Sequence, residues 1–490
     1  MGPSGSRVYP GLRFVVAAVV IAGVLGACSS GKAPGDPGPT GAPPNHVASP
    51  ASSVLRLAGA EVAPPPSPLP QRLGIGVEAE APDISGWVAQ TKIPFDYVYQ
   101  YLAGGSGTSS DWTTWNSNGM FPLYYAQAAA TAHLVPVFSY YQLLDSVSSC
   151  GGCGEAQKDL TNLNSPKTMA AYFADFAMLM ERLGSGVHAG VTGFGRPAVV
   201  QVEPDLSAYV EQAAIEKSRC YGFCTGEGNN PDHVKAAVAS SGDPDVAGYA
   251  NTYHGFVLAL AHLRDLYAPH VLLGYHVSNW ASLTDIGTST SPSLNVVGAA
   301  DAVASFTEAS GVSHYDLVFN DVSDRDAGYY ETFDKADVWW DRDDVTFPNF
   351  HRWETYLGTI LASLGKPGVV WQIPVGNQYF DTENNSMDHT QDNRVEYFFT
   401  HPTELTSIGI VALLFGPGNA GSTSYTDNDK DGVKDFAPTC TTHGVSSGKI
   451  CDSHAAISSD DDGGYLRMVA TKYYQDPIHL GAEASTTPGG

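Results

Sequence analysis

A short apolar run followed by a longer helical or loop segment recurs eight times after residue 71 of this 490-residue chain. The runs are rich in β-branched and aromatic residues, and each ends in polar or aromatic ones. They cover 73–80, 95–102, 134–144, 198–205, 270–280, 315–326, 368–377 and 409–419. Runs that are apolar on both faces suit parallel strands with other elements packed on both sides. The pattern therefore predicts eight parallel strands, each followed by a crossover segment.

Two of the intervening segments carry clear helix signals. The segment 165–184 starts with Ser165 as N-cap and Pro166 in the first turn, and 246–269 repeats apolar residues at three- and four-residue spacing. Eight βα units predict an α/β fold, a single (β/α)8 TIM barrel with long loops over 71–490. An open doubly wound sheet is the alternative, but the chain lacks the glycine-rich phosphate turn of that fold.

The N-terminus has the pattern of a targeting segment. Arg7 and Arg13 precede the apolar run FVVAAVVIAGVLGA, which is too short for a comfortable membrane span and ends in Leu-Gly-Ala-Cys at Cys28. This tetrapeptide resembles the lipobox of bacterial lipoproteins. The resemblance implies a signal peptide over 1–28, lipidation of Cys28 and export to the outer face of the cell membrane. An ordinary secretory signal with an incidental cysteine is the alternative.

The next segment, 29–70, is rich in proline, glycine and small polar residues, which cannot bury enough surface to fold. We expect a disordered tether there. The chain carries 25 Lys and Arg against 51 Asp and Glu, a formal net charge of −26. This balance argues against a nucleic-acid partner and against attraction to anionic lipid headgroups, so we expect membrane contact only through the lipid anchor. We also expect a monomer.

Beyond Cys28, six cysteines form three close pairs, which in an exported protein favours disulfides. A redox motif or a zinc site built from the first two pairs is the alternative. The predicted disulfides join Cys150 to Cys153, Cys220 to Cys224 and Cys440 to Cys451.

Polar and aromatic side chains follow the predicted strands. In a barrel of this kind the C-terminal strand ends converge on one face, where active sites lie. Aromatic faces stack on sugar rings, and carboxylates and amides bind hydroxyls, so the mixture predicts a cleft for a polysaccharide or oligosaccharide. The candidate substrate-binding residues are Glu78, Glu80, Tyr140, Gln142, Asp205, His276, Trp280, Asn320, Asp324, Trp371, Gln372 and Asn377.

Cleavage of a glycosidic bond needs two carboxyl groups. The chain resembles barrel glycoside hydrolases, whose largest retaining group carries an acid/base glutamate after strand four and a nucleophilic glutamate after strand seven. The resemblance assigns the first role to Glu203, but Gln372 stands where the second acid is needed. Other barrel glycosidases pair carboxyls from strands four and six, so we expect Glu203 to act with Asp321. Glu78 or Glu80 could replace either partner.

The chain also resembles an uncharacterised family of exported actinobacterial barrel lipoproteins. The motifs that carry this resemblance are GVEAE, YQYLAGG, PVFSYYQLL, VEPD, FNDVSDRD, WQIPVGN and QDNRVEY. They span about 72–420 and imply no particular activity.

The sequence is compatible with more than one function. The leading expectation is a surface-tethered glycoside hydrolase acting on a cell-envelope or environmental polysaccharide. The alternative is a non-catalytic glycan-binding lipoprotein on a degenerate barrel, in which the acids cap helices or hold loops. A metal-dependent esterase or phosphodiesterase would need clustered histidines, which the sequence lacks.

A separate motif, DNDKDGVKD at 427–435, resembles the calcium loops of dockerins and thrombospondin-type repeats. Carboxylates at alternate positions can wrap a hard cation, and the glycine permits the sharp turn. Pro438 stands where an EF-hand has its bidentate glutamate, so the loop is not a complete EF-hand. We expect a structural Ca²⁺ held by Asp427, Asp429, Asp431, Val433 and Asp435; a merely solvated acidic loop is the alternative.

Overall fold

The computed structural model describes residues 63–146, 150, 152–322, 327, 336–375, 393–416 and 464–481. Several of the predictions above fall outside these residues. They concern the signal peptide with Cys28, the greater part of the tether, the calcium loop 427–435, Cys440, Cys451, Asp324 and Asn377.

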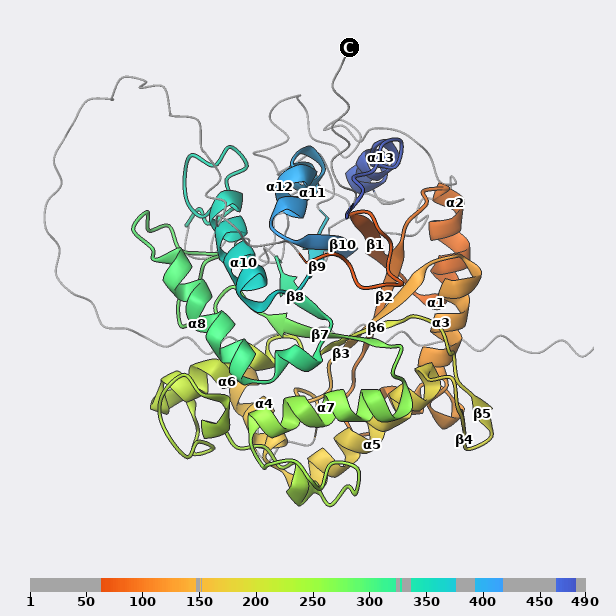
Figure 1. Ribbon diagram of the computed structural model, residues 1–490, viewed down its shortest axis with the longest axis vertical. Helices are drawn as coiled ribbons and strands as arrows, with labels where there is room; N and C mark the ends of the chain where they lie inside the picture. The colour runs from red at the N-terminus through yellow and green to blue at the C-terminus, as the bar shows by residue number, and fades with distance from the viewer. Residues whose placement is uncertain are drawn as a thin grey trace, which may run out of the picture. The chain divides into compact units, whose positions relative to one another are not determined.

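Eight parallel strands form a closed barrel in the order β1-β10-β9-β8-β7-β6-β3-β2 (Figure 1). The pairing of β1 with both β10 and β2 closes the ring. Each strand lies inside one of the eight predicted runs, so the predicted barrel is confirmed. The strands are β1 (Gly74–Glu78), β2 (Tyr97–Leu102), β3 (Val135–Tyr140), β6 (Val199–Val202), β7 (Leu272–Val277), β8 (Leu317–Asp321), β9 (Gly368–Pro374) and β10 (Ile410–Gly416).

Helices follow the strands and pack on the outside of the barrel (Figure 1). The longer ones are α3 (Phe121–Thr131), α4 (Glu155–Leu163), α5 (Pro166–Leu183), α6 (Leu206–Ile215), α7 (Tyr253–Tyr267), α8 (Val296–Ala309), α10 (Phe350–Leu364), α11 (Asn393–Thr400), α12 (Pro402–Ser407) and α13 (Gly464–Tyr473). Short turns α1 (Ala81–Asp83) and α2 (Ala89–Thr91) follow β1, and a small hairpin joins β4 (Val187–His188) to β5 (Val191–Thr192). Among the described residues, no helix is both long and apolar enough to cross a membrane.

The two helix predictions fare differently. In α5, the Ser165 side chain accepts a hydrogen bond from the Thr168 amide, as an N-cap should. The second helix, α7, begins at Tyr253 and not at 246, because Thr252 is its N-cap and accepts from the Gly255 amide. The backbone before it pairs elsewhere, since the amide of Ala236 donates to Asn251.

Alternation along the strands separates two apolar layers. Inside the barrel, Tyr97, Val137, Leu272 and Phe319 belong to one cluster, while the outward side chains join the larger cluster under the helices. Space inside is tight: a Cβ on Gly274 would lie 2.3 Å from the Phe319 ring.

The inner cluster also contains Leu69, which is buried beside the first residues of the strands. Its amide donates to Pro66, and the Gln71 carbonyl accepts from Leu480. Residues 63–70 were assigned to the tether in the sequence analysis, yet Leu69 packs as part of the barrel. The described fold therefore starts before residue 71.

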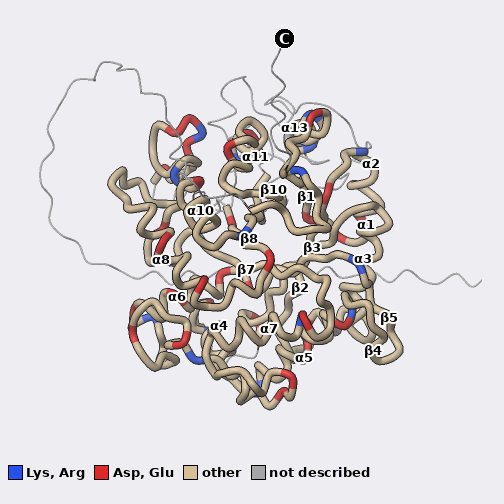
Figure 2. The backbone as a smooth tube through the Cα atoms, in the orientation of Figure 1, with Lys and Arg blue, Asp and Glu red and all other residues tan. Residues whose placement is uncertain are grey.

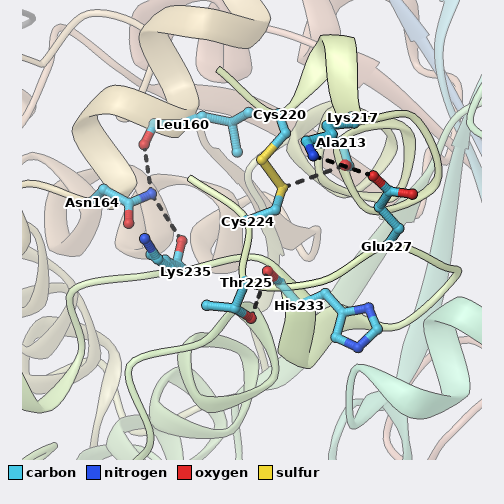
Figure 3. The surroundings of a disulfide bond; sticks show 10 residues. All are labelled: Leu160, Asn164, Ala213, Lys217, Cys220, Cys224, Thr225, Glu227, His233 and Lys235. Carbon is cyan, nitrogen blue, oxygen red and sulfur yellow. Dashed lines mark hydrogen bonds and ion pairs between the residues drawn. A yellow bond between two sulfur atoms is a disulfide. The ribbon is translucent and has the colours of Figure 1, made fainter. Parts of the chain in front are cut away.

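Two of the three predicted cysteine pairs are bonded, Cys150 to Cys153 and Cys220 to Cys224. The second disulfide lies in the loop after α6, where the Cys224 Sγ contacts the Ala213 carbonyl (Figure 3). The third pair is not among the disulfides of the described chain, because Cys440 and Cys451 both lie outside the described residues. The disulfide between Cys440 and Cys451 therefore stays a prediction.

The excess of acidic over basic residues in the composition is also visible along the described backbone. Acidic positions outnumber basic ones, and several lie at the ends of the central strands (Figure 2). In the loop that carries the second disulfide, Lys217 faces Glu227 in an exposed ion pair (Figure 3).

Candidate active site at the barrel mouth

The C-terminal ends of the eight strands form what we call the barrel mouth. Alternate residues of each strand point into the barrel and form its inward rows. Those nearest the C-terminal end of a strand therefore reach the mouth. Tyr101, for example, follows Tyr97 and Tyr99 of the inner cluster, and Asp321 follows Leu317 and Phe319. The residues in these rows are Glu78, Tyr99, Tyr101, Ser139, Gln201, His276, Asp321 and Trp371.

Glu78 is the last residue of β1 and is partly buried. Burial raises the pKa of its carboxyl to about 7, with Glu80 adding to the rise and a hydrogen bond from Tyr99 opposing it. Gly416 on the neighbouring strand makes room for this pair, since a Cβ there would lie 2.8 Å from the Tyr99 hydroxyl and 3.6 Å from Glu78 Oε2. A carboxyl with this pKa is present in both protonation states near neutral pH.

Aromatic rings line the mouth beside Glu78. Trp371 packs against Tyr99 and Tyr101, with ring centroids 6.3 Å and 5.6 Å away, and against His276 at 5.9 Å. The Trp371 indole is buried, and its Nε1 has no hydrogen-bond partner among the described residues. Rings at the mouth of a pocket, with polar groups between them, are typical of sugar-binding sites.

Asp205 lies where β6 passes into α6, in the left-handed conformation with φ of 69°. It holds the N-cap position of α6, but its side chain makes no capping hydrogen bond. Its Oδ1 instead accepts from the Ser278 hydroxyl at 2.8 Å and lies 3.6 Å from His276 Nε2. Asp205, His276 and Ser278 therefore meet at the mouth.

A buried polar chain supports His276 from below. The Ser139 hydroxyl donates to Gln201 Oε1 at 3.1 Å, and Gln201 Nε2 lies 2.8 Å from His276 Nδ1. Ser139 and Gln201 were not among the residues predicted from the sequence. The signal that could have identified them is a polar residue at an inward-facing position in each of two otherwise apolar runs, VPVFSY and VVQV.

Glu203, the expected catalytic partner of Asp321, is buried at the end of β6. Its backbone adopts φ of 42°, which interrupts the alternation of β6 just where the strand ends. The buried carboxyl group accepts hydrogen bonds from the amides of Gln142 at 3.1 Å and Leu143 at 3.3 Å. It lines a small cavity together with His276 of β7 and Tyr253 of α7, and burial raises the pKa of its carboxyl to about 8. In this position Glu203 anchors the loop after β3.

Four of the expected substrate-binding residues, Tyr140, Asn320, Trp280 and Gln142, do not belong to the inward rows. The Tyr140 ring packs on Tyr172 in the layer under α5, and Asn320 Oδ1 accepts from Trp353 of α10. These two side chains point outward because they occupy alternate positions from the inner rows. Trp280 packs on Tyr209 of α6, with ring centroids 4.8 Å apart, and Gln142 is fully buried.

The remaining expected residues lie at or near the rim. Asp321 is half-buried at the end of β8, and its backbone carbonyl accepts from Asn279 Nδ2. Glu80 lies just beyond β1, where partial desolvation of its carboxyl and the nearby Asp83 raise its pKa. Gln372 has φ of 51°, and the pairing of β9 with β10 shifts register beside it. No group of three or more His, Cys, Asp or Glu side chains in the described part of the chain is arranged to hold a metal ion.

No family model matches the chain, and no curated protein matches it. Solved structures that resemble it are barrels. The family 5 glycoside hydrolase mannosidase from Rhizomucor miehei aligns at 9% identity over 82% of this chain and 92% of its own, with a TM-score of 0.41. The modular family 26 endo-β-1,4-mannanase from Cellulomonas fimi aligns at 11% identity and a TM-score of 0.40, over 72% of this chain and 66% of that one. At this level, likeness to these enzymes does not bear on the activity of the chain.

Proposed function

We propose that the chain is a glycoside hydrolase in which Glu78 is the general acid and Asp205 is the base or nucleophile. The observation that carries the proposal is the pair Glu78 and Tyr99 at the aromatic-lined mouth, where burial brings the pKa of Glu78 to about 7. A general acid works best when its pKa lies near the operating pH. Glu78 can then hold a proton for the leaving oxygen and lose it during the reaction.

The partner must be an anion on the other side of the scissile bond. Asp205 fits because Ser278 donates to its Oδ1 and His276 Nε2 lies beside the same oxygen, and donors of this kind favour the charged form. In the closed barrel order, β6 is the third strand from β1, so the two acids belong to well-separated parts of the rim. Asp321, on β8, is the second candidate for this role.

A polysaccharide of the cell envelope or the environment is the proposed substrate class. Tyr101 would stack on a sugar ring and Asp321 would bind hydroxyls, while the buried Trp371 and His276 would hold these groups in place. We further propose the anchor at Cys28 and a structural Ca²⁺ at 427–435, both on sequence grounds. The anchor would keep the barrel at the outside of the cell, where such a substrate is found.

The test is a screen of the purified chain against polysaccharides and aryl glycosides, followed by two variants on whichever substrate is cleaved. Glu78→Gln and Asp205→Asn should each lower kcat by roughly 10²- to 10⁴-fold, the usual contribution of acid–base catalysis. Glu308→Gln, at an exposed carboxyl of α8, is the matched control and should keep most of the activity. If Asp321→Asn is the damaging variant and Asp205→Asn is not, the partner is Asp321.

One observation favours the non-catalytic alternative. The Glu203 carboxyl is buried and accepts from two backbone amides of the loop after β3, and β9 carries Gln372 where a second carboxyl is needed. A glycan-binding protein would bind an oligosaccharide in calorimetry without releasing reducing ends. That result across the whole screen would replace the hydrolase proposal.

A further inference from the structure

Ser139, Gln201 and His276 form a continuous hydrogen-bonded chain across three neighbouring strands, β3, β6 and β7. All three side chains are at most 1% exposed, so water does not compete for these bonds. Buried polar groups are costly unless they are hydrogen-bonded, and a linked set holds its members in fixed orientations. This series of hydrogen bonds ends at His276 at the mouth, next to Asp205.

The direction of each bond determines where His276 carries its proton. The Ser139 hydroxyl donates to Gln201 Oε1, which leaves the Gln201 amide nitrogen facing His276 Nδ1 at 2.8 Å. An amide nitrogen can only donate, so Nδ1 must accept. A neutral imidazole has one donor and one acceptor nitrogen, and the proton is therefore on Nε2.

The charge at the mouth favours the same tautomer. His276 Nε2 lies 3.6 Å from Asp205 Oδ1, the oxygen that also accepts from Ser278. With the proton on Nε2, a donor faces the carboxylate. With the proton on Nδ1, a lone pair would face it and the two acceptors would repel each other. Both ends of the imidazole thus select Nε2–H.

We propose that Ser139 and Gln201 are positioning residues that fix His276 as an Nε2–H donor, and that this donor orients the Asp205 carboxylate and stabilises its charge. The tautomer follows from the orientation of the Gln201 amide and from the carboxylate of Asp205 beside Nε2. The consequence for catalysis rests on the proposed function, in which Asp205 is the base or nucleophile.

Nitrogen-15 NMR of the full chain labelled at histidine side chains reads the tautomer directly. The wild-type His276 should show a protonated Nε2 and an unprotonated Nδ1. In Gln201→Glu a carboxylate replaces the donor, so a proton should appear on Nδ1. Gln127→Glu makes the same chemical change at an exposed position on α3, away from these hydrogen bonds, and should leave the His276 signals unchanged.

If Gln201→Glu does not fold, Gln201→Met keeps the length of the side chain and removes the donor. That variant should populate both tautomers, and Ser139→Ala should give a smaller shift in the same direction. A wild-type signal with the proton on Nδ1, or a tautomer that none of these variants changes, would overturn the proposal.

Kinetics separate this inference from the proposed function. Gln201→Glu should lower kcat by roughly 10- to 100-fold with KM changed little, since the proton of His276 is then no longer confined to the nitrogen that faces Asp205. The loss should be the same for good and poor leaving groups, since it acts on Asp205 and not on the acid. If His276 shows the expected tautomer but the protein cleaves no glycan, the hydrolase proposal is refuted, and the proposal that Ser139 and Gln201 position His276 is retained. The expected tautomer together with unchanged kcat in Gln201→Glu would refute the role given to Asp205.

Discussion

The pKa of Glu78 depends on one neighbour that can be removed without changing the shape of the mouth. Tyr99 lowers the pKa of Glu78, while burial and Glu80 raise it. Tyr99→Phe removes only the hydroxyl, so the pKa of Glu78 should rise further above its present value of about 7. An acid loses activity once it is deprotonated, and the basic limb of the pH dependence of kcat/KM should therefore move to higher pH. Tyr101→Phe is the control, and an equal shift in both variants would contradict this role of Tyr99.

At the scale of single residues, the sequence predicts which side chains reach the mouth only where the strand is regular. Glu78, His276, Asp321 and Trp371 follow the alternation and lie at the mouth. Glu203 follows a strand as well, but its positive φ turns it to the backbone of the β3 loop. That backbone conformation depends on contacts with a loop about sixty residues away, so a local pattern cannot predict it.

Among the elements, the connection after β3 depends on Glu203. Its carboxyl group accepts from two buried backbone amides of that loop. Glu203→Gln places an amide nitrogen against one of these donors, so stability should fall by about 1–3 kcal/mol. Activity measured well below the melting temperature should be largely retained. Wild-type stability with activity lost would instead return Glu203 to the catalytic pair.

The strands were predictable as elements because each is a compact run of β-forming residues between turns. The residues at which helices begin were harder to predict. The apolar spacing of α7 continues backward to residue 246, whereas the helix begins where Thr252 caps it. Spacing alone does not distinguish a first helical turn from a turn that pairs with a neighbouring loop, here the one containing Ala236.

The molecule as a whole buries several carboxyl groups that burial protonates. The pKa of each of Asp175, Glu203, Glu211 and Glu354 is raised to about 8, with burial the largest cause. The folded chain therefore binds protons that the unfolded chain releases near its ordinary carboxyl pKa values of roughly 4. This stabilisation is complete below the unfolded pKa values and is lost as the pH rises through about 8. The free energy of unfolding, from urea titrations, should be larger at about pH 5.5 than at about pH 8.5; equal values would contradict it.

A calcium ion bound only to the folded chain would raise its stability by mass action. We expect the melting temperature to be higher in calcium than in chelator, and Asp429→Ala to remove the difference. Identical melting curves for the wild type under the two conditions would rule out the site at 427–435.

The central claim is that Glu78 donates the proton to the leaving group. It is tested most directly by comparing Glu78→Gln with the wild type on two glycosides of one sugar, with a good and a poor leaving group. A leaving group that departs as a stable anion needs no proton, so the variant should lose roughly 10²-fold or more on the poor one and little on the good one. Equal losses on both glycosides, or no loss on either, would contradict the assignment of Glu78 as the acid.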